Sequence, residues 1–270
     1  MRNNPSRDNL CISMGGSLPH HRGAWPPSRE TARSWLDCGD RLYLVSGALP
    51  ILFRDQALVA VDKPAGLAVH RGWAGDCDVA MMRVRDQLGL HVFPVHRLDR
   101  ATSGVLLFAL SSEIASRLCE SFTTHAVEKT YLALVRGIPP EAGLIDHPLP
   151  PGEDRHVPRV SAQTEYLRQE VFGRYSLIEV RPRTGRLHQV RRHLKHIACP
   201  VIGDVNYGKG EHNRLFRDRF GLHRLFLHAT RLCLPHPLTG GRLDIASPLP
   251  PELAAVIEQL RDDQTRLQSS

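Results

Sequence analysis

From Leu52 onward, segments patterned like strands and segments patterned like helices follow one another at irregular intervals. ILFRDQALVAVDKPAG is typical of two short strands joined by a turn, and the pattern stops at Pro64. Further strand-like runs are VLLFAL (105–110) and LFLHATRLCL (225–234). Regular βαβ units would alternate strand and helix evenly, so this order favours an α+β fold built on a mixed sheet.

Three helices are predicted from apolar residues that recur every three or four positions. The first follows Ser111 or Ser112, either of which can serve as its N-cap. The apolar faces consist of Ile114, Leu118 and Phe122, then Leu187, Val190, Leu194 and Ile197, and finally Leu253, Val256, Ile257 and Leu260. The proline-rich stretch 139–158 has no such period and is predicted to be a surface loop.

Composition divides the chain into three parts. Residues 1–48 are rich in Gly, Pro, Ser and Arg without a sustained apolar period, which predicts a disordered or loosely attached leader. Residues 49–262 hold all the periodic segments and form one folded domain, and 263–270 are expected to be a flexible tail. Neither an internal repeat nor a second apolar core is visible in the sequence.

Charge and cysteine content narrow the class of protein. The chain has 35 Lys plus Arg against 28 Asp plus Glu, a formal charge of +7, which favours a polyanionic partner. No apolar run approaches the roughly 20 residues of a membrane-spanning helix, so we expect a soluble, cytoplasmic protein with no membrane partner. The six cysteines stand singly, without CxxC spacing, which predicts reduced structural thiols.

Asp99 stands in HRLDRATSGVLLFAL, between two arginines and directly before a strongly apolar strand. An aspartate has a pKa near ~3.9 in water, but an apolar setting raises it, so a buried carboxylate needs a cation to stay charged. Arg191, at the edge of the apolar face of the helix over 187–198, could supply that cation. A buried, charged carboxylate suits a nucleophile, whereas the alternative interpretation is an ordinary surface ion pair or turn residue.

The segment from Arg181 to Ile197 contains six Lys or Arg residues and no acid. Such a surface suits phosphate contacts, although a merely solvated basic face is the alternative. His188, His193 and His196 also lie here, but their spacings of five and three residues do not place them on one helical face, and no cysteine or carboxylate joins them. We therefore expect no metal site.

Three segments occur in the order HRLDRATSGVLL, EKTYLALVRG and RTGRLHQVRRHLKHIACPVIGD. Together they closely resemble the three motifs of the RluA family of pseudouridine synthases, which isomerise uridine to pseudouridine in structured RNA. The resemblance covers roughly residues 50–250 and is strongest to a subgroup that acts on tRNA. It implies the pseudouridine synthase fold: a mixed, mostly antiparallel central sheet flanked by helices and loops, with an active-site cleft across the sheet, in a catalytic domain over 49–262.

The resemblance also implies a role for each motif residue. Asp99 would be the nucleophile, attacking either the base or the sugar C1′, and Arg191 would pair with its carboxylate. Tyr131 would lie against the target base and help remove its C5 proton, and Leu227 would pack around that base; on pattern alone, both are ordinary core residues. Arg97 would fill the gap left by the flipped-out nucleotide. Further substrate contacts are expected from Arg186, His188, Arg192 and Lys195.

The function that the resemblance implies is the isomerisation of uridine in tRNA, at position 65 in the T-arm stem, without a cofactor; we also expect a monomer and no metal. Large-subunit ribosomal RNA is the alternative substrate. A non-catalytic RNA-binding or folding factor is the alternative of another class, but a pure binder has no need of a buried, charged carboxylate. The intact set of Asp99, Tyr131 and Arg191 therefore favours an enzyme.

Overall fold

A computed structural model of the 270-residue chain describes residues 35–37, 42–44, 47–70, 78–152 and 157–268. The helices in these ranges are α1 (Ala80–Leu88), α2 (Ser112–Thr123), α3 (Gln189–His196), α4 (Gly210–Phe220) and α5 (Pro251–Gln268). The strands are β1 (Trp35–Asp37), β2 (Leu42–Leu44), β3 (Ile51–Arg54), β4 (Leu58–Lys63), β5 (Phe93–Pro94), β6 (Ser103–Ala109), β7 (Glu128–Arg136), β8 (Ala142–Asp146), β9 (Gln163–Phe172), β10 (Tyr175–Pro182), β11 (Leu227–Pro235) and β12 (Arg242–Ala246).

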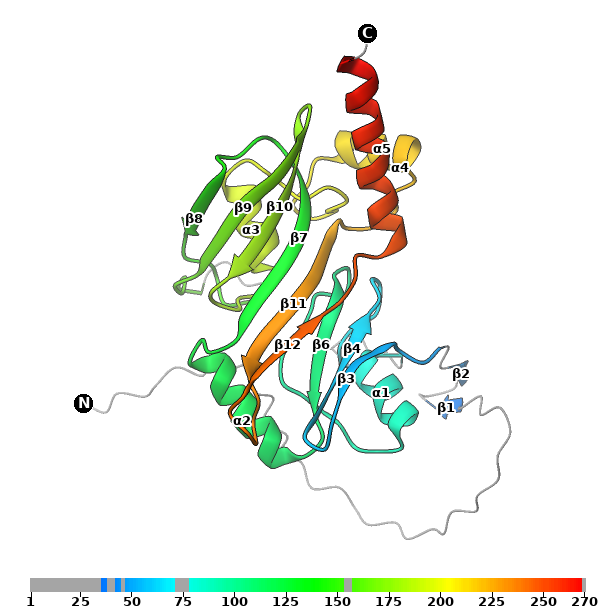
Figure 1. The fold of residues 1–270 in the computed structure, drawn as a ribbon, viewed down its shortest axis with the longest axis vertical. Coiled ribbons are helices and arrows are strands. Elements are labelled where there is room, and N and C mark those ends of the chain that lie inside the picture. The colour runs from blue at the N-terminus through cyan, green and yellow to red at the C-terminus, as the bar shows by residue number, and fades with distance from the viewer. Residues whose placement is uncertain (1–34, 38–41, 45–46, 71–77, 153–156, 269–270) are drawn as a thin grey trace, which may run out of the picture.

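One long sheet organises the molecule, with strand order β3-β4-β6-β11-β7-β10-β9-β8 and with β12 and β5 attached to β11 and β6 (Figure 1). Its strand pairs are antiparallel except β11 and β6, which run parallel with His228 opposite Ser103. The expected mixed, mostly antiparallel sheet is confirmed. Because β11 lies between β6 and β7, segments far apart in sequence meet at the centre of the sheet.

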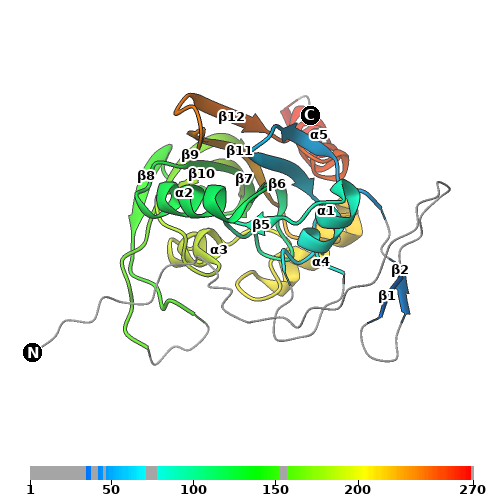
Figure 2. The same ribbon diagram turned by 90° about the horizontal axis from the view of Figure 1, so that it is seen from below.

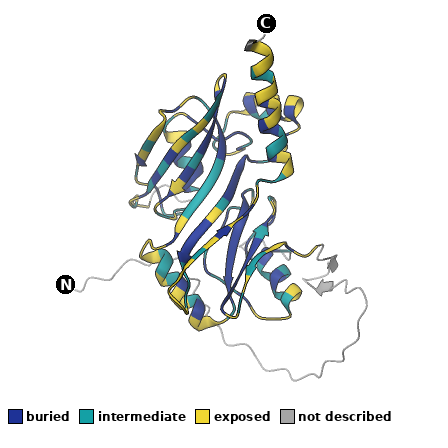
Figure 3. Ribbon diagram, in the orientation of Figure 1, coloured by how far each residue is buried: buried dark blue, intermediate teal, exposed yellow. Residues whose placement is uncertain are grey.

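The two faces of the sheet carry different helices. In Figure 2, α1 and α3 lie on one side of the sheet, and α5 lies on the other. On the α3 side, Val190 and Leu194 pack against Ala133 and Ile178. The residues of β7 and β10 that alternate with these point to the other face, where Leu134 and Leu177 pack with α4 and α5. The helix residues in this cluster are Phe216, Phe220, Leu253 and Val256. The central strands are therefore buried on both faces, as Figure 3 shows.

Several element boundaries differ from the sequence-based predictions. Helix α2 begins after Ser111, whose hydroxyl accepts the N–H of Ile114 at 3.2 Å, as expected of an N-cap. The helix expected from 187 starts only at Gln189, because His188 has a left-handed backbone with φ 52°. The prediction of a surface loop over 139–158 is wrong for β8, which pairs with β9 at the sheet edge. Helices α1 and α4 were not predicted at all.

The expected flexible tail over 263–270 does not begin where the sequence placed it. Helix α5 continues to Gln268, and Asp263 accepts a hydrogen bond from Arg219 of α4 at 2.7 Å, which ties this turn to the domain. Residues 269–270 lie outside the described residues. The predicted leader over 1–48 also lies mostly outside them; within it, β1 and β2 pair antiparallel in a small separate sheet.

The cysteines agree only in part with the prediction of reduced thiols. Cys199 and Cys233 are free and buried, as expected of structural thiols. Cys119 in α2 is disulfide-bonded, so the prediction is wrong at that position. Cys11, Cys38 and Cys77 lie outside the described residues. The spacing of single cysteines gave no signal for a disulfide, because two distant cysteines can meet only through the fold.

Candidate active site

Asp99 lies in a tight turn between β5 and β6, where the Thr102 N–H donates to the Asp99 carbonyl at 3.0 Å. Lys63 holds this turn from the end of β4: its Nζ donates to the carbonyls of Arg100 (3.2 Å), Leu67 (2.7 Å) and Pro64 (2.9 Å). The Lys63 side chain is fully buried, and burial lowers its pKa to about 7. The VDKPAG segment thus positions the loop that carries the aspartate.

Arg191 joins two carboxylates. Its Nη1 donates to Asp99 Oδ2 at 3.2 Å, which confirms the predicted pair between the two motifs. Its Nε and Nη2 donate to the two oxygens of Asp204 at 2.7 and 2.9 Å. Side-chain exposure is 18% for Asp99, 6% for Arg191 and 0% for Asp204, so the most buried carboxylate fixes the arginine and the most accessible one faces the cavity.

Asp204 is the second carboxylate that contacts Arg191, and the sequence analysis missed it. Burial alone would raise the pKa of Asp204, but hydrogen bonds from Arg191 and from the N–H groups of Tyr207 and Asn206 lower it. The preceding Gly203 has φ +79°, and a Cβ there would lie 2.0 Å from the Arg224 carbonyl, so only glycine fits. The sequence did contain a signal for Asp204, because Gly203 and Asp204 are the last two residues of the third motif segment.

A cavity of about 860 Å³ opens beside Asp99 on the α3 side of the sheet. Tyr131 of β7 and Leu227 of β11 line it, so the three motif regions meet as expected. Burial, and then the charge of Asp99, raise the pKa of Tyr131, which is therefore a neutral phenol at physiological pH. Leu227 is 2% exposed and presents an apolar wall.

The remaining predicted contacts divide into two groups. Arg97, Arg186 and His188 line the cavity; Arg97 is exposed, and the His188 Nε2 lies 3.9 Å from Asp99 Oδ1. Burial lowers the pKa of His188 despite the opposing charge of Asp99. Arg192 and Lys195 lie outside the lining. The Arg192 Nη1 donates to the Pro150 carbonyl at 3.1 Å, and the Lys195 ammonium lies 5.7 Å from the Tyr207 ring centroid.

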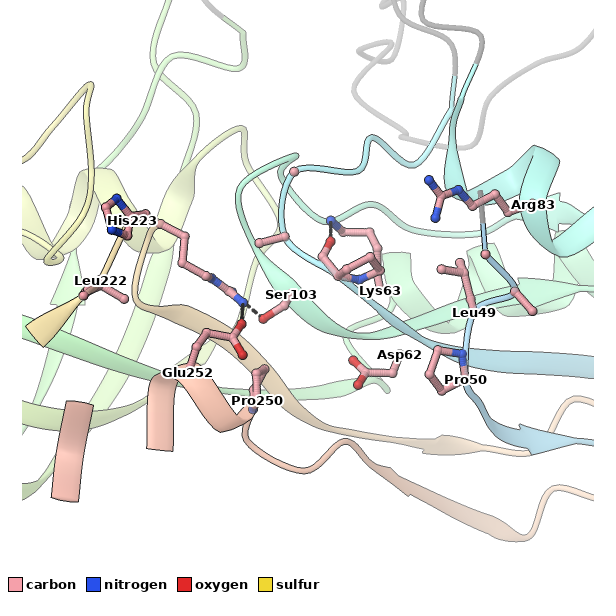
Figure 4. Close-up of a pocket in the computed structure, with 17 residues that line it drawn as sticks. Leu49, Pro50, Asp62, Lys63, Arg83, Ser103, Leu222, His223, Pro250 and Glu252 are labelled. Carbon is pink, nitrogen blue, oxygen red and sulfur yellow. Dashed lines mark hydrogen bonds and ion pairs between the residues drawn. The ribbon is translucent and has the colours of Figure 1, made fainter. Parts of the chain in front are cut away.

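A second cavity, of about 620 Å³, is lined by residues of β4, β6 and the start of α5 (Figure 4). Arg224 donates there to Ser103 Oγ at 2.6 Å and to Glu252 Oε1 at 2.8 Å. Ser103 Oγ also lies 2.8 Å from Nδ1 of His228. Arg224 and Glu252 thus neutralise each other's charge. Because Ser103 belongs to β6 and His228 to β11, the cluster stabilises the junction of these two strands.

Within the described part of the chain, no group of three or more His, Cys, Asp or Glu side chains is arranged to hold a metal ion. His193, one of the three histidines considered in the sequence, is buried between Thr164 Oγ1 (2.8 Å) and the His147 carbonyl (2.9 Å). Among the helices that the structure describes, none is both long and apolar enough to cross a bilayer.

Comparison with known proteins agrees with this geometry. Residues 57–196 match the model of the RNA pseudouridylate synthase family. The tRNA pseudouridine synthase C of Vibrio parahaemolyticus is 44% identical over 216 residues, covering 72% of this chain and 88% of the relative. That of Vibrio cholerae is 45% identical over 212 residues, covering 71% and 87%. The structure of Human RNA Pseudouridylate Synthase Domain Containing 4 superposes with a TM-score of 0.65 at 29% identity, covering 78% of this chain and 93% of that one.

The chain therefore belongs to the RNA pseudouridylate synthase family, of the RluA type. It is an enzyme that isomerises uridine to pseudouridine, and its sheet is the pseudouridine synthase fold.

Proposed function

We propose that this enzyme acts on tRNA, at the uridine at position 65 of the T-arm stem, with Asp99 as its nucleophile. The observation that carries the proposal is the Asp99 carboxylate, held by Arg191 at the mouth of a cavity that also contains Tyr131 and Leu227. The relatives named tRNA pseudouridine synthase C support tRNA as the substrate, since the alignments cover most of both chains.

The reaction breaks the bond between C1′ and N1 and forms one between C1′ and C5, and the C5 proton is lost while N1 gains one. The carboxylate of Asp99 attacks either the base or C1′, and Arg191 pairs with it at 3.2 Å. Tyr131 packs against the uracil. Because a neutral phenol is a weak base, this environment favours ring packing over direct proton removal by Tyr131. All the heavy atoms of the product come from the substrate, and the proton lost at C5 is balanced by the one gained at N1, so the reaction needs no oxidant, reductant or co-substrate.

The target base must leave the RNA stack to reach Asp99, at a cost of a few kcal/mol. Arg97 is exposed at the rim of the cavity, where its guanidinium plane can stack in the vacated position. Leu227 closes the pocket around the flipped base, while Arg186 and His188 border it. Arg192 and Lys195 lie outside the cavity, so any contact they make is with RNA beyond the target nucleotide.

The substrate is tested by mapping pseudouridine in cellular RNA from a strain that lacks the gene and in tRNA transcripts incubated with the purified full chain. Carbodiimide primer extension should show a signal in the T-arm that depends on the enzyme. A lost signal in large-subunit ribosomal RNA instead would reassign the substrate. The absence of product from every RNA tested would leave only the RNA-binding alternative.

Replacing Arg97 with alanine should slow product formation in single turnover by about 10- to 100-fold, because the flipped state loses a stacking partner. The thermal melting temperature should stay at the wild-type value, since the side chain is exposed. Quench-flow measurement with excess enzyme over tRNA gives the rate. An unchanged single-turnover rate would contradict the role proposed for Arg97.

The relatives named tRNA pseudouridine synthase C come from bacteria, and an enzyme that modifies tRNA works where tRNA is held. The cytoplasm stays the predicted location for this chain. The monomeric state also stays a prediction, and light scattering of the purified protein measures it directly.

A further inference from the structure

Lys129 of β7 lies in the cavity of Asp99, two residues before Tyr131 and on the same face of the strand. Lys129 Nζ donates to the Thr184 carbonyl at 2.9 Å; Thr184 also lines the cavity and follows β10, the strand that pairs with β7. Gly185 follows Thr184 directly, and a Cβ added there would lie 3.9 Å from the ammonium, at ordinary van der Waals distance. The side chain thus links β7 to the segment after β10 with one of its three N–H donors.

The charge of Lys129 has no anionic partner in the part of the chain that the structure describes. The carboxylates there lie beyond ion-pair distance of its Nζ, and Asp99, the acid that lines this cavity, is paired with Arg191. His96 also lines the cavity, but its Nε2 accepts the Leu107 N–H, and burial together with the charge of Lys129 lowers the pKa of His96 to about 3. It therefore stays neutral and offers no compensating charge.

Burial lowers the pKa of Lys129 to about 8, so the ammonium remains mostly protonated at neutral pH. A buried cation with a single neutral acceptor is unfavourable in the free protein, since desolvation is not repaid by an ion pair. Two of its N–H donors are free to meet an anion that enters the cavity. The anionic groups of an RNA substrate are its phosphates.

We propose that Lys129 binds a phosphate that flanks the flipped uridine. Two residues of extended chain span about 6.6 Å, so a uracil against Tyr131 places its own ribose-phosphate beside Lys129. The lining carries Arg97, Arg186 and Arg191 as further cations against Asp99 alone, which makes the whole cavity attractive to a polyanion. This inference rests on the proposed RNA substrate.

The test is the salt dependence of RNA binding. A fluorescent, unmodified T-arm transcript is titrated with the full chain between 50 and 300 mM KCl, for the wild type, K129M and K129R. K129M should bind about 10- to 100-fold more weakly, and the slope of log binding constant against log salt should fall by about one. K129R keeps the charge and should keep the wild-type slope.

The matched control is R219M, which removes an exposed arginine of α4 that pairs with Asp263 outside the cavity. Its slope should equal that of the wild type. K129Q retains a donor for the Thr184 carbonyl and replaces K129M if melting shows that the methionine variant is unfolded. Pseudouridine formation is measured in parallel for every variant.

The outcomes separate this inference from the proposed function. A wild-type enzyme that modifies tRNA, with a K129M slope equal to the wild-type slope, overturns the phosphate contact alone. A K129M enzyme whose slope is unchanged but whose catalytic rate falls overturns it as well, because Lys129 would then act on the base. A wild-type chain that forms no pseudouridine in any RNA overturns the proposed function, while a reduced slope for K129M would still support the phosphate contact.

Discussion

Asp99→Asn should lower the rate of pseudouridine formation by at least about four orders of magnitude while leaving the fold intact. The amide has nearly the shape of the carboxylate but no charge, so it cannot act as a nucleophile. Arg191 keeps its two hydrogen bonds to Asp204 in this variant, so no buried charge is left without a partner. Release of tritium from uracil labelled at C5 measures the reaction directly.

The control for this substitution is Asp218→Asn, which makes the same chemical change on the exposed surface of α4. It should retain the wild-type rate. Asp99→Asn should also bind unmodified tRNA with nearly wild-type affinity, because the binding cations are untouched. Turnover of Asp99→Asn near the wild-type rate would refute the assignment of the nucleophile.

The fold could be predicted from sequence where periodicity was strong and local. Helix α2 follows from the spacing of its apolar residues and from the Ser111 cap, and strands β6 and β11 follow from the apolar runs over 105–110 and 225–234. Helix α1 was missed because its sequence, AMMRVRDQL, is short and its N-cap Val79 makes no side-chain cap hydrogen bond. Strand β8 was missed because it is an edge strand with little burial, so its alternation is weak.

The pair of Asp99 and Arg191 could be predicted, because a buried carboxylate needs a cation to stay charged and Arg191 lay at the edge of an apolar helix face. Asp204 could not be found in the same way. Its role depends on a turn after α3 that folds back beneath Arg191, and no periodic pattern announces such a turn. Lys129 was hidden because a lysine in an alternating strand is ordinarily solvated.

The dependence of Arg191 on Asp204 gives the second large prediction. Arg191 is 6% exposed and faces two carboxylates, Asp99 and Asp204. Its orientation is set by Asp204, because Asp204 accepts two hydrogen bonds from it. If Asp204 becomes neutral, Arg191 loses its main ion pair and turns toward Asp99, the remaining charge. The nucleophile would then be drawn into a closer ion pair and away from the geometry required for attack.

Asp204→Asn should therefore reduce both stability and catalysis. Removing one partner of a buried ion pair costs about 3 to 5 kcal/mol, which lowers the melting temperature on the order of 10 °C. The rate of isomerisation should fall about 10²-fold through misplacement of Arg191 and Asp99. Asp244→Asn is the matched control, since Asp244 forms the same type of pair with Arg231 on the exposed surface, and its melting temperature should change little.

The pH dependence of stability distinguishes an electrostatic role for Asp204 from simple packing. Because the folded-state pKa of Asp204 lies below its unfolded value, its charge stabilises the protein above the unfolded pKa, and this contribution is lost as the pH falls through the folded pKa. Urea denaturation should therefore show a constant stability difference between wild type and Asp204→Asn from pH 8 to about 5, shrinking under stronger acid. A difference that stayed constant at low pH would show that Asp204 acts through shape alone, and Arg191 would then need another anchor.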